Sequence, residues 1–214
     1  MPEHPSAVAG TSIAAAISIL WLAGATLPAQ SRLQIASPEN GAVVNAGQAL
    51  SVTIKAPPSA FQSISIVGNG PFALTTSLTA PPYQYSYSIP VDFPSGCYRF
   101  KAAGVTASGE TVSSDPIEID IERPGEAKKL QSEYLSLTFG DEKDLPLLIW
   151  GIFPDASKID VTRSKRMVYT SDRPAVAAVS GEGTVTAVGA GKARITVKYG
   201  DKTLVVPVVI THNR

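Results

Sequence analysis

Residues 168–209 read VYTSDRPAVAAVSGEGTVTAVGAGKARITVKYGDKTLVVPVV, and this stretch decides the fold. Short runs rich in Val, Thr and Ala alternate with turns that contain Gly183, Gly189, Gly191 and Gly200. Val, Ile and Thr favour strands, and two strands joined by a short glycine-bearing turn form a hairpin. The pattern therefore predicts consecutive antiparallel strands at residues 184–188, 193–199 and 203–210.

Four short elements follow one another in a fixed order in this half of the chain. They are aromatic-x-Ser at 169–171, Pro-x-Val-Ala-x-Val at 174–179, Gly-x-Val-Thr-Ala at 183–187 and Gly-x-Ala-x-Ile-Thr at 191–196. In this order they resemble the group 2 bacterial immunoglobulin-like domain, over residues 130–211. The resemblance implies an immunoglobulin-like β-sandwich that serves display and adhesion outside the cytoplasm rather than catalysis. Tyr169 stands where Trp is commoner in the family, which implies a slightly rearranged core in the same fold.

Residues 33–122 also show the two-residue period of strands. Apolar and polar side chains alternate at 50–55 and again at 117–122, so each run is expected to bury one face. Tyr98 follows Gly96 at the start of a late strand, as in the tyrosine corner of immunoglobulin-like sandwiches. This half therefore resembles a second bacterial immunoglobulin-like domain, less closely than the C-terminal half does.

The expected fold class is all-β, with two tandem immunoglobulin-like β-sandwiches after an N-terminal signal segment. Residues 33–122 form the first sandwich and 130–211 the second, joined by the polar linker RPGEAKK at 123–129. In the second sandwich, a strand is predicted at residues 134–139, with Leu135, Leu137 and Phe139 on one face. A buried strand interrupted by Pro146 is predicted at 145–153, and a long charged loop at 155–167.

The N-terminal segment predicts export. Residues 11–25 are uncharged and apolar, and small residues at possible cleavage points follow, so residues 1–29 are interpreted as a signal peptide. No Lys or Arg precedes the apolar run, and a retained membrane anchor is the alternative. Either reading places the rest of the chain in the periplasm, at the cell surface or in the medium.

The residue content argues against an enzyme. Nucleophilic catalysis most often needs a histidine base, and the two histidines are His4, in the signal segment, and His212, near the C-terminus. Cys97 is the single cysteine, which excludes an internal disulfide and leaves no cluster for zinc. The formal net charge is zero, so no basic field for nucleic acid is expected. No catalytic, cofactor-binding or metal-ligating residue is therefore predicted, and no cofactor.

Two groups of residues are candidates for ligand binding: acidic turns for calcium and a row of tyrosines for stacking. Acidic residues gather in two predicted turns and could supply oxygen ligands for calcium, although lysines interrupt both; a solvated turn is the simpler interpretation. Tyr83, Tyr85 and Tyr87 alternate with polar residues, which places their rings toward the core rather than on an outer stacking strip. The acidic residues are Asp141, Glu142 and Asp144 in one turn and Asp155 and Asp160 in the other.

The predicted function is a non-catalytic exported binding or cell-surface adhesion module. Its partner would be an envelope or extracellular protein or glycan, and contact with a membrane would occur only through an uncleaved N-terminal segment. The alternative is a purely structural spacer or envelope assembly component without a dedicated ligand.

Overall fold

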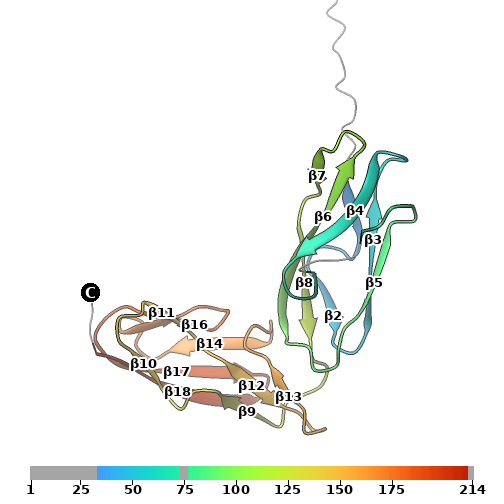
Figure 1. Cartoon of the computed structure of the whole chain (residues 1–214). Coiled ribbons are helices and arrows are strands. Elements are labelled where there is room, and N and C mark those ends of the chain that lie inside the picture. Colours follow the sequence, from blue (N-terminus) through green and yellow to red (C-terminus); the bar gives the residue numbers. More distant parts are fainter. Residues whose placement is uncertain (1–32, 73–76, 212–214) are drawn as a thin grey trace, which may run out of the picture. The chain divides into compact units, whose positions relative to one another are not determined.

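The computed structural model describes residues 33–72 and 77–211 of the 214-residue chain (Figure 1). Strands dominate these residues, and the helical content described is one 3₁₀ turn, η1 (Gly70–Phe72). Two hydrophobic cores form, and both belong to one compact unit, Ser31–Arg214. The all-β fold with two sandwiches is confirmed. The predicted signal segment, residues 1–29, lies outside the described residues.

The first sandwich packs two sheets against each other. Strands β1, β3 and β5 form one sheet, in that order. The other sheet has the order β2-β8-β6-β4, and β7 pairs with β6. The strands are β1 (Gln34–Ser37), β2 (Ala42–Asn45), β3 (Ala49–Lys55), β4 (Phe61–Gly68), β5 (Gln84–Ser88), β6 (Gly96–Thr106), β7 (Thr111–Ser113) and β8 (Ile117–Glu122).

The second sandwich is built around the sheet β10-β18-β17-β14, in which β10 and β18 run parallel. Two smaller three-stranded sheets, β11-β16-β15 and β13-β12-β9, supply the remaining strands. The strands are β9 (Lys129–Ser132), β10 (Leu137–Phe139), β11 (Asp144–Pro146), β12 (Ile149–Ile152), β13 (Lys158–Asp160), β14 (Met167–Ser171), β15 (Ala177–Val179), β16 (Thr184–Ala187), β17 (Gly191–Tyr199) and β18 (Lys202–Ile210).

The core of the first sandwich depends on the alternation of side chains along β3 and the second part of β4. Val52, Ile64 and Ile66 are fully buried, because every second side chain in these segments turns inward. Tyr98 forms the predicted tyrosine corner, since its hydroxyl donates to the Pro94 carbonyl at 2.9 Å. Its ring packs against Phe93 with the ring centroids 5.3 Å apart. The ring therefore fills the core while the hydroxyl meets a backbone acceptor.

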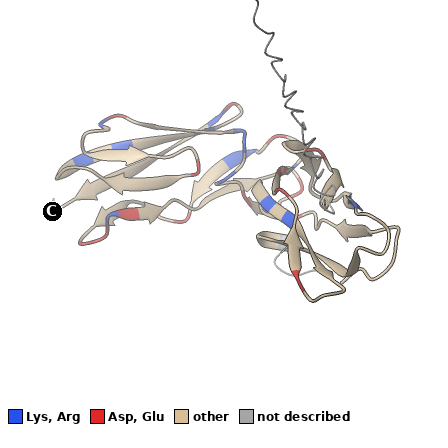
Figure 2. Cartoon of the chain, turned by 90° about the horizontal axis from the view of Figure 1, so that it is seen from above, with Lys and Arg blue, Asp and Glu red and all other residues tan. Residues whose placement is uncertain are grey.

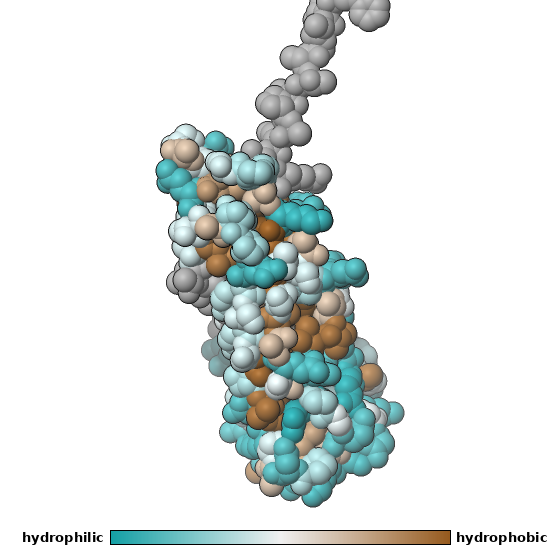
Figure 3. Space-filling model, turned by 90° about the vertical axis from the view of Figure 1, so that its right-hand side faces the viewer, coloured by the Kyte–Doolittle hydropathy of each residue, from teal (hydrophilic) through white to brown (hydrophobic). Residues whose placement is uncertain are grey.

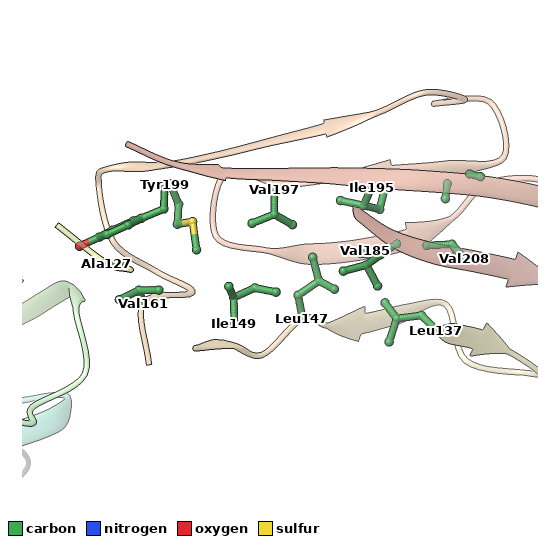
Figure 4. Packing of buried hydrophobic residues seen from close by; sticks show 14 of the residues in the cluster. Ala127, Leu137, Leu147, Ile149, Val161, Val185, Ile195, Val197, Tyr199 and Val208 are labelled. Carbon is green, nitrogen blue, oxygen red and sulfur yellow. The ribbon is translucent and has the colours of Figure 1, made fainter. Parts of the chain in front are cut away.

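The core of the second sandwich forms along β17. Figure 4 shows Ile195 and Val197 pointing from this strand toward Val185 and Ile149 on the facing layer, while the ring of Tyr199 extends to one end of the core. All five side chains are fully buried. Burying a branched aliphatic side chain of this size stabilises a fold by about 1.5–3 kcal/mol. Their common orientation makes β17 the central strand of this core.

The tight turn between β17 and β18 requires glycine at one position. Gly200 has φ of +60°, in the left-handed region that residues with a Cβ seldom enter. The turn fixes the register of a hairpin in which Gly191 pairs with Ile210 and Tyr199 with Lys202. This hairpin is the one that the sequence predicts.

The structure confirms one sequence prediction in this half and corrects two. The interruption expected at Pro146 is confirmed: residues 145–153 are divided between β11 and β12, because Pro146 lacks a backbone N–H with which to continue the ladder. The strand expected at 134–139 is only Leu137–Phe139, and Leu135, expected on the buried face, is 96% exposed. The loop expected at 155–167 contains β13. The segment 123–129 includes the buried Ala127 and the first residue of β9. The domain boundaries themselves stay a prediction.

Trp150 lies on β12 between two charged neighbours. Its indole Nε1 donates to Glu133 Oε2 at 2.8 Å, and Lys158 Nζ lies 4.5 Å from the ring centroid. Lys158 Nζ is also 3.8 Å from Glu133 Oε2. The ring is therefore held by a hydrogen bond at its edge and a cation over its face.

Changing Tyr98→Phe keeps the ring and removes the corner hydrogen bond. The free energy of unfolding is expected to fall by about 1 kcal/mol, which is typical for the loss of one intramolecular hydrogen bond. Urea unfolding followed by circular dichroism measures it. Tyr134→Phe, at a side chain that is 44% exposed, is the control and should leave the midpoint unchanged. Equal midpoints for Tyr98→Phe and the wild type would show that the corner does not stabilise the fold.

Candidate functional site

The outer face of β17 carries a row of cations. Ala193, Ile195, Val197 and Tyr199 are buried, so the alternate residues of the strand point outward. These outward residues are Lys192, Arg194, Thr196 and Lys198, of which the three cations are exposed. Consecutive outward positions on a strand are about 6.6–6.8 Å apart. The row is therefore a line of basic groups with a hydroxyl between them.

Arg194 is held in place by Asp172, in the turn after β14. The Arg194 backbone N–H donates to Asp172 Oδ1 at 2.7 Å, and its Nε donates to Oδ2 at 2.9 Å. The backbone hydrogen bond first, and then the guanidinium, lower the pKa of the Asp172 carboxyl below its usual range. Asp172 therefore stays charged and orients Arg194, while no ion pair within the described ranges joins Lys192 or Lys198 to a carboxylate.

A shallow depression lies beside this row. It has a volume of about 360 Å³, and its lining combines the cationic residues of β17 with apolar residues of β18. Arg173 Nη1 donates to the Lys192 carbonyl at 3.3 Å, which places a further cation at the rim. The lining residues used here are Arg173, Lys192, Arg194, Pro207 and Val209. Such a surface suits a carboxylate, phosphate or sulfate group attached to an extended molecule.

The zero net charge conceals an uneven distribution. Residues 33–122 contain three Lys and Arg but seven Asp and Glu, whereas residues 123–211 contain thirteen and ten. Figure 2 shows Lys and Arg on the strands of the half that ends at the C label. The basic character therefore belongs to the second sandwich.

Two carboxylates of β8 are buried, against the expectation that they share a solvated face. Glu122 Oε2 accepts from Ser164 Oγ at 2.7 Å, and Oε1 accepts from the Lys165 backbone N–H at 2.8 Å. Asp120 is 1% exposed, and its Oδ2 forms an ion pair with Lys165 Nζ. The hydrogen bond from Lys165 Nζ to Asp120 is the main cause that raises the pKa of Lys165. The β8 acids therefore tie the first core to the segment between β13 and β14.

Asp120 has one unusual atom. Its Oδ1 is buried and has no hydrogen-bond partner among the described residues. A buried charged oxygen without a partner lowers the stability of the fold. The ion pair at Oδ2 offsets part of this cost for Asp120.

Cys97 pairs with Asp120 across β6 and β8 and is half-buried. Burial first, then the charges of Asp120 and Glu118, raises the pKa of the thiol. The thiolate is the nucleophilic form of cysteine, so this environment makes Cys97 a poor nucleophile.

The acidic turn residues make local contacts. Asp155 accepts from Ser157 and pairs with Arg123, with the Arg123 Nη2 to Asp155 Oδ2 distance at 2.6 Å. Asp160 Oδ1 accepts from the backbone and hydroxyl of Thr162. Within residues 33–72 and 77–211, no three Asp, Glu, His or Cys side chains form a group that could hold a metal ion. The calcium alternative gains no geometric support in these residues. His4 and His212 lie outside the described residues.

The tyrosines of the first sandwich have the predicted orientation. Tyr83 is buried, and Tyr85 and Tyr87 are partly buried against the same core. Residues 189–191 lie at the start of β17 and are followed by that strand rather than a helix. A phosphate cradle at a helix N-terminus is therefore not formed there.

The basic row could have been found in the sequence, but the buried acids could not. Lys192, Arg194 and Lys198 are separated by two and four residues, which places them on one face of a strand. Arg194 and Lys198 lie within the strand predicted at 193–199, and Lys192 directly precedes it. The alternation at residues 117–122 instead places Asp120 outward, and its partner Lys165 is 45 residues away in a segment expected to be a loop. No helix in the described part of the chain is long and apolar enough to cross a membrane.

One family model matches part of the second sandwich. Residues 165–212 match the Big-like family model, a bacterial Ig-like domain. None of the curated proteins compared with the chain matches it.

Solved structures with similar folds include Clostridium thermocellum CbhA fibronectin(III)-like modules. They are 20% identical over 42% of this chain and 93% of that chain, with a TM-score of 0.37. Domains 4 and 5 of the S-layer protein SbsC are 16% identical over 86% and 98%, with a TM-score of 0.35. Bacteroides uniformis beta-glucuronidase 3 is 10% identical over 85% of this chain and 25% of that chain, with a TM-score of 0.36. Similarities this low carry no argument about function.

The fold thus defines an all-β protein of the immunoglobulin-like class. The match at residues 165–212 confirms the resemblance of the C-terminal half to bacterial Ig-like domains.

Changing Lys165→Met removes the partner of the buried Asp120. The free energy of unfolding is expected to fall by about 1–3 kcal/mol, the cost of leaving a buried polar group unsatisfied. Chemical denaturation measures the loss. Lys202→Met is the control, because Lys202 pairs with the exposed Asp201 and such a surface pair contributes at most about 1 kcal/mol. If both variants lose the same stability, the Asp120 pair has no special role.

Stability should also decline in alkaline solution. Burial raises the pKa of Tyr98 to about 12 and also raises the pKa of Tyr169. An unfolded tyrosine titrates near pH 10, so above that pH the folded chain holds more protons and its free energy of unfolding falls as pH rises. Below pH of about 10 this contribution is fully present. The stability difference between wild type and Tyr98→Phe should shrink between about pH 10 and about pH 12, measured by urea unfolding. A constant difference would refute the assignment.

Proposed function

We propose that this protein is a non-catalytic, exported immunoglobulin-like module that binds anionic groups on an envelope or extracellular polymer. The observation that carries the class is the match of residues 165–212 to a bacterial Ig-like domain. Domains of this class are generally non-catalytic, and the chemistry of Cys97 supports the same conclusion. The apolar, uncharged segment at 11–25 supports export.

The basic row on β17 is the surface that we assign to binding. Lys192 and Lys198 are exposed on one face of a strand whose opposite face is anchored in the core. A strand fixed on both edges holds its outward side chains at constant spacing, so a polymer with regularly placed anions can contact several at once. The face lacks exposed aromatic rings, which favours charged groups over the stacking of neutral sugar rings.

The test compares two double variants with equal charge change. Lys192→Gln with Lys198→Gln removes two cations of the row, and Lys55→Gln with Lys101→Gln removes two exposed cations of the first sandwich. The proteins are eluted from an immobilised sulfated polysaccharide with a salt gradient. Wild type and the Lys55→Gln, Lys101→Gln variant should elute together, and the Lys192→Gln, Lys198→Gln variant at lower salt. Ion pairing to a polyanion weakens with salt, so elution reports it directly.

Two results would contradict the proposal. One is a wild-type chain that is not retained at about 0.15 M salt, where the Debye length is about 8 Å. The other is equal elution of the two double variants, which would mean that only net charge matters.

A structural role is the alternative, as a spacer or envelope assembly component without a ligand. The contacts of Glu122 with Ser164 and Lys165 favour it, because they bind the two cores within one compact unit. A chain that recovers no partner from envelope extracts would favour this alternative.

A further inference from the structure

The strand β5 ends its sheet without a neighbour on one side. In the order β1-β3-β5 it pairs with β3 alone, and no other strand of the described residues is joined to it (Figure 1). An unpaired strand edge presents backbone N–H and C=O groups that can pair with another strand. The open edge of β5 is therefore a potential contact surface.

The flanking hydrogen bonds show which residues of β5 face outward. The Ile54 N–H donates to the Tyr83 carbonyl at 2.9 Å, and the Ile89 N–H donates to the Gln48 carbonyl at 2.9 Å. Backbone groups alternate in direction along an antiparallel strand. Tyr85 and Tyr87 therefore bond toward β3, and the backbone groups of Ser86 face the open side.

The same alternation extends to the ends of the strand. Ser88 presents its N–H and Gln84 its carbonyl on the open side, whereas the Gln84 N–H already donates to the Pro82 carbonyl at 2.9 Å. The available set is thus the N–H and carbonyl of Ser86, the N–H of Ser88 and the carbonyl of Gln84. This set can form a ladder with an antiparallel strand.

β5 also lacks the residues that usually block an edge. Its sequence, QYSYS, contains no charge and no proline. Natural sheets commonly protect edges with charged side chains or proline. Among the other edge strands, β13 carries Lys158 and Asp160 and β11 carries Asp144 and Pro146, whereas β1 and β15, like β5, contain neither a charge nor proline.

We propose that β5 pairs antiparallel with β5 of a second copy of this chain, about a two-fold axis at Ser86. The sequence is nearly symmetric about this residue, with Tyr85 and Tyr87 on either side. Ser86 then pairs with its own counterpart through two hydrogen bonds. Each Ser88 N–H donates to the Gln84 carbonyl of the other copy. A self-complementary contact of this kind closes as a dimer.

The register explains the choice of a second copy over an unrelated peptide. Ser86 occupies a hydrogen-bonded position, so Tyr85 lies opposite Tyr87 of the other copy at a non-hydrogen-bonded position, where side chains approach most closely. Aromatic pairs across strands contribute about 0.2–1 kcal/mol each. Both tyrosines are partly exposed, and pairing would cover their rings. Figure 3 views the molecule from the right-hand side of Figure 1 and shows hydrophobic and hydrophilic residues interspersed on that face.

The contact is small. A single five-residue edge belongs with interfaces below about 1,200 Å², which are typically weak and transient. The dimer is therefore expected to be reversible and to depend on protein concentration. It does not involve β17, so the basic row keeps its access to a ligand.

The test is sedimentation of the purified chain over a concentration series, with two lysine variants. Ser86→Lys places like charges opposite each other on the two-fold axis, and should raise the dissociation constant at least tenfold. Ser51→Lys is the matched control, because Ser51 pairs with Ser86 across β3 and β5 and is exposed, but lies one strand inside the edge. Its dissociation constant should stay within twofold of wild type. Thermal unfolding of both variants verifies that they are folded.

If the Ser86→Lys variant does not fold, cysteine cross-linking tests the same contact. Ser86→Cys should give a disulfide-linked dimer under mild oxidation and Ser51→Cys should not, with Cys97 present in both. A monomeric wild type at the highest concentration reached, equal weakening by both lysine variants, or equal cross-linking of both cysteine variants would overturn the proposal.

Discussion

The register of β17 is the constraint on which the second sandwich depends. This strand pairs with β18 along nine residues and with β14 along five, so its position is fixed from both sides. Because side chains alternate, a slip of one residue would turn Ile195 and Val197 to solvent and Lys192 inward. The same register thus creates the core on one face and the row of cations on the other. Core and candidate binding surface cannot vary independently in this strand.

The parts of the fold that follow a local rule were predictable from the sequence. The β17–β18 hairpin is local, because two alternating runs and the turn at Gly200 lie next to each other in the chain. The tyrosine corner at Tyr98 is local as well, since its hydroxyl bonds four residues back. Leu135 shows the limit of the rule: it continues the alternation of Leu137 and Phe139, yet β10 begins only after it and its side chain meets solvent. Alternation predicts a face only where a neighbouring strand covers it.

The buried acids of β8 were unpredictable for the opposite reason. Glu122 and Asp120 find their partners at residues 164 and 165, more than 40 positions away, and the intervening chain forms the first part of another core. Hydrogen bonds from Ser164 and from the backbone of Lys165 offset the cost of removing the Glu122 carboxylate from water, and the Lys165 ammonium does the same for Asp120. Long-range compensation of this kind leaves no local pattern in a single sequence. The basic row, by contrast, was visible as a pattern, although its exposure had to come from the structure.

The surroundings of Trp150 give the molecule a built-in optical reporter. The only other tryptophan in the chain is Trp21, so in a chain that lacks residues 1–29 all indole emission comes from β12. The Glu133 carboxylate at the indole nitrogen and the Lys158 ammonium over the ring set its local electric field. Indole emission then follows the second sandwich alone, whereas tyrosine emission comes from both halves, because Tyr134, Tyr169 and Tyr199 lie outside the first sandwich. Selective excitation of the indole thereby follows the melting of the second half by itself.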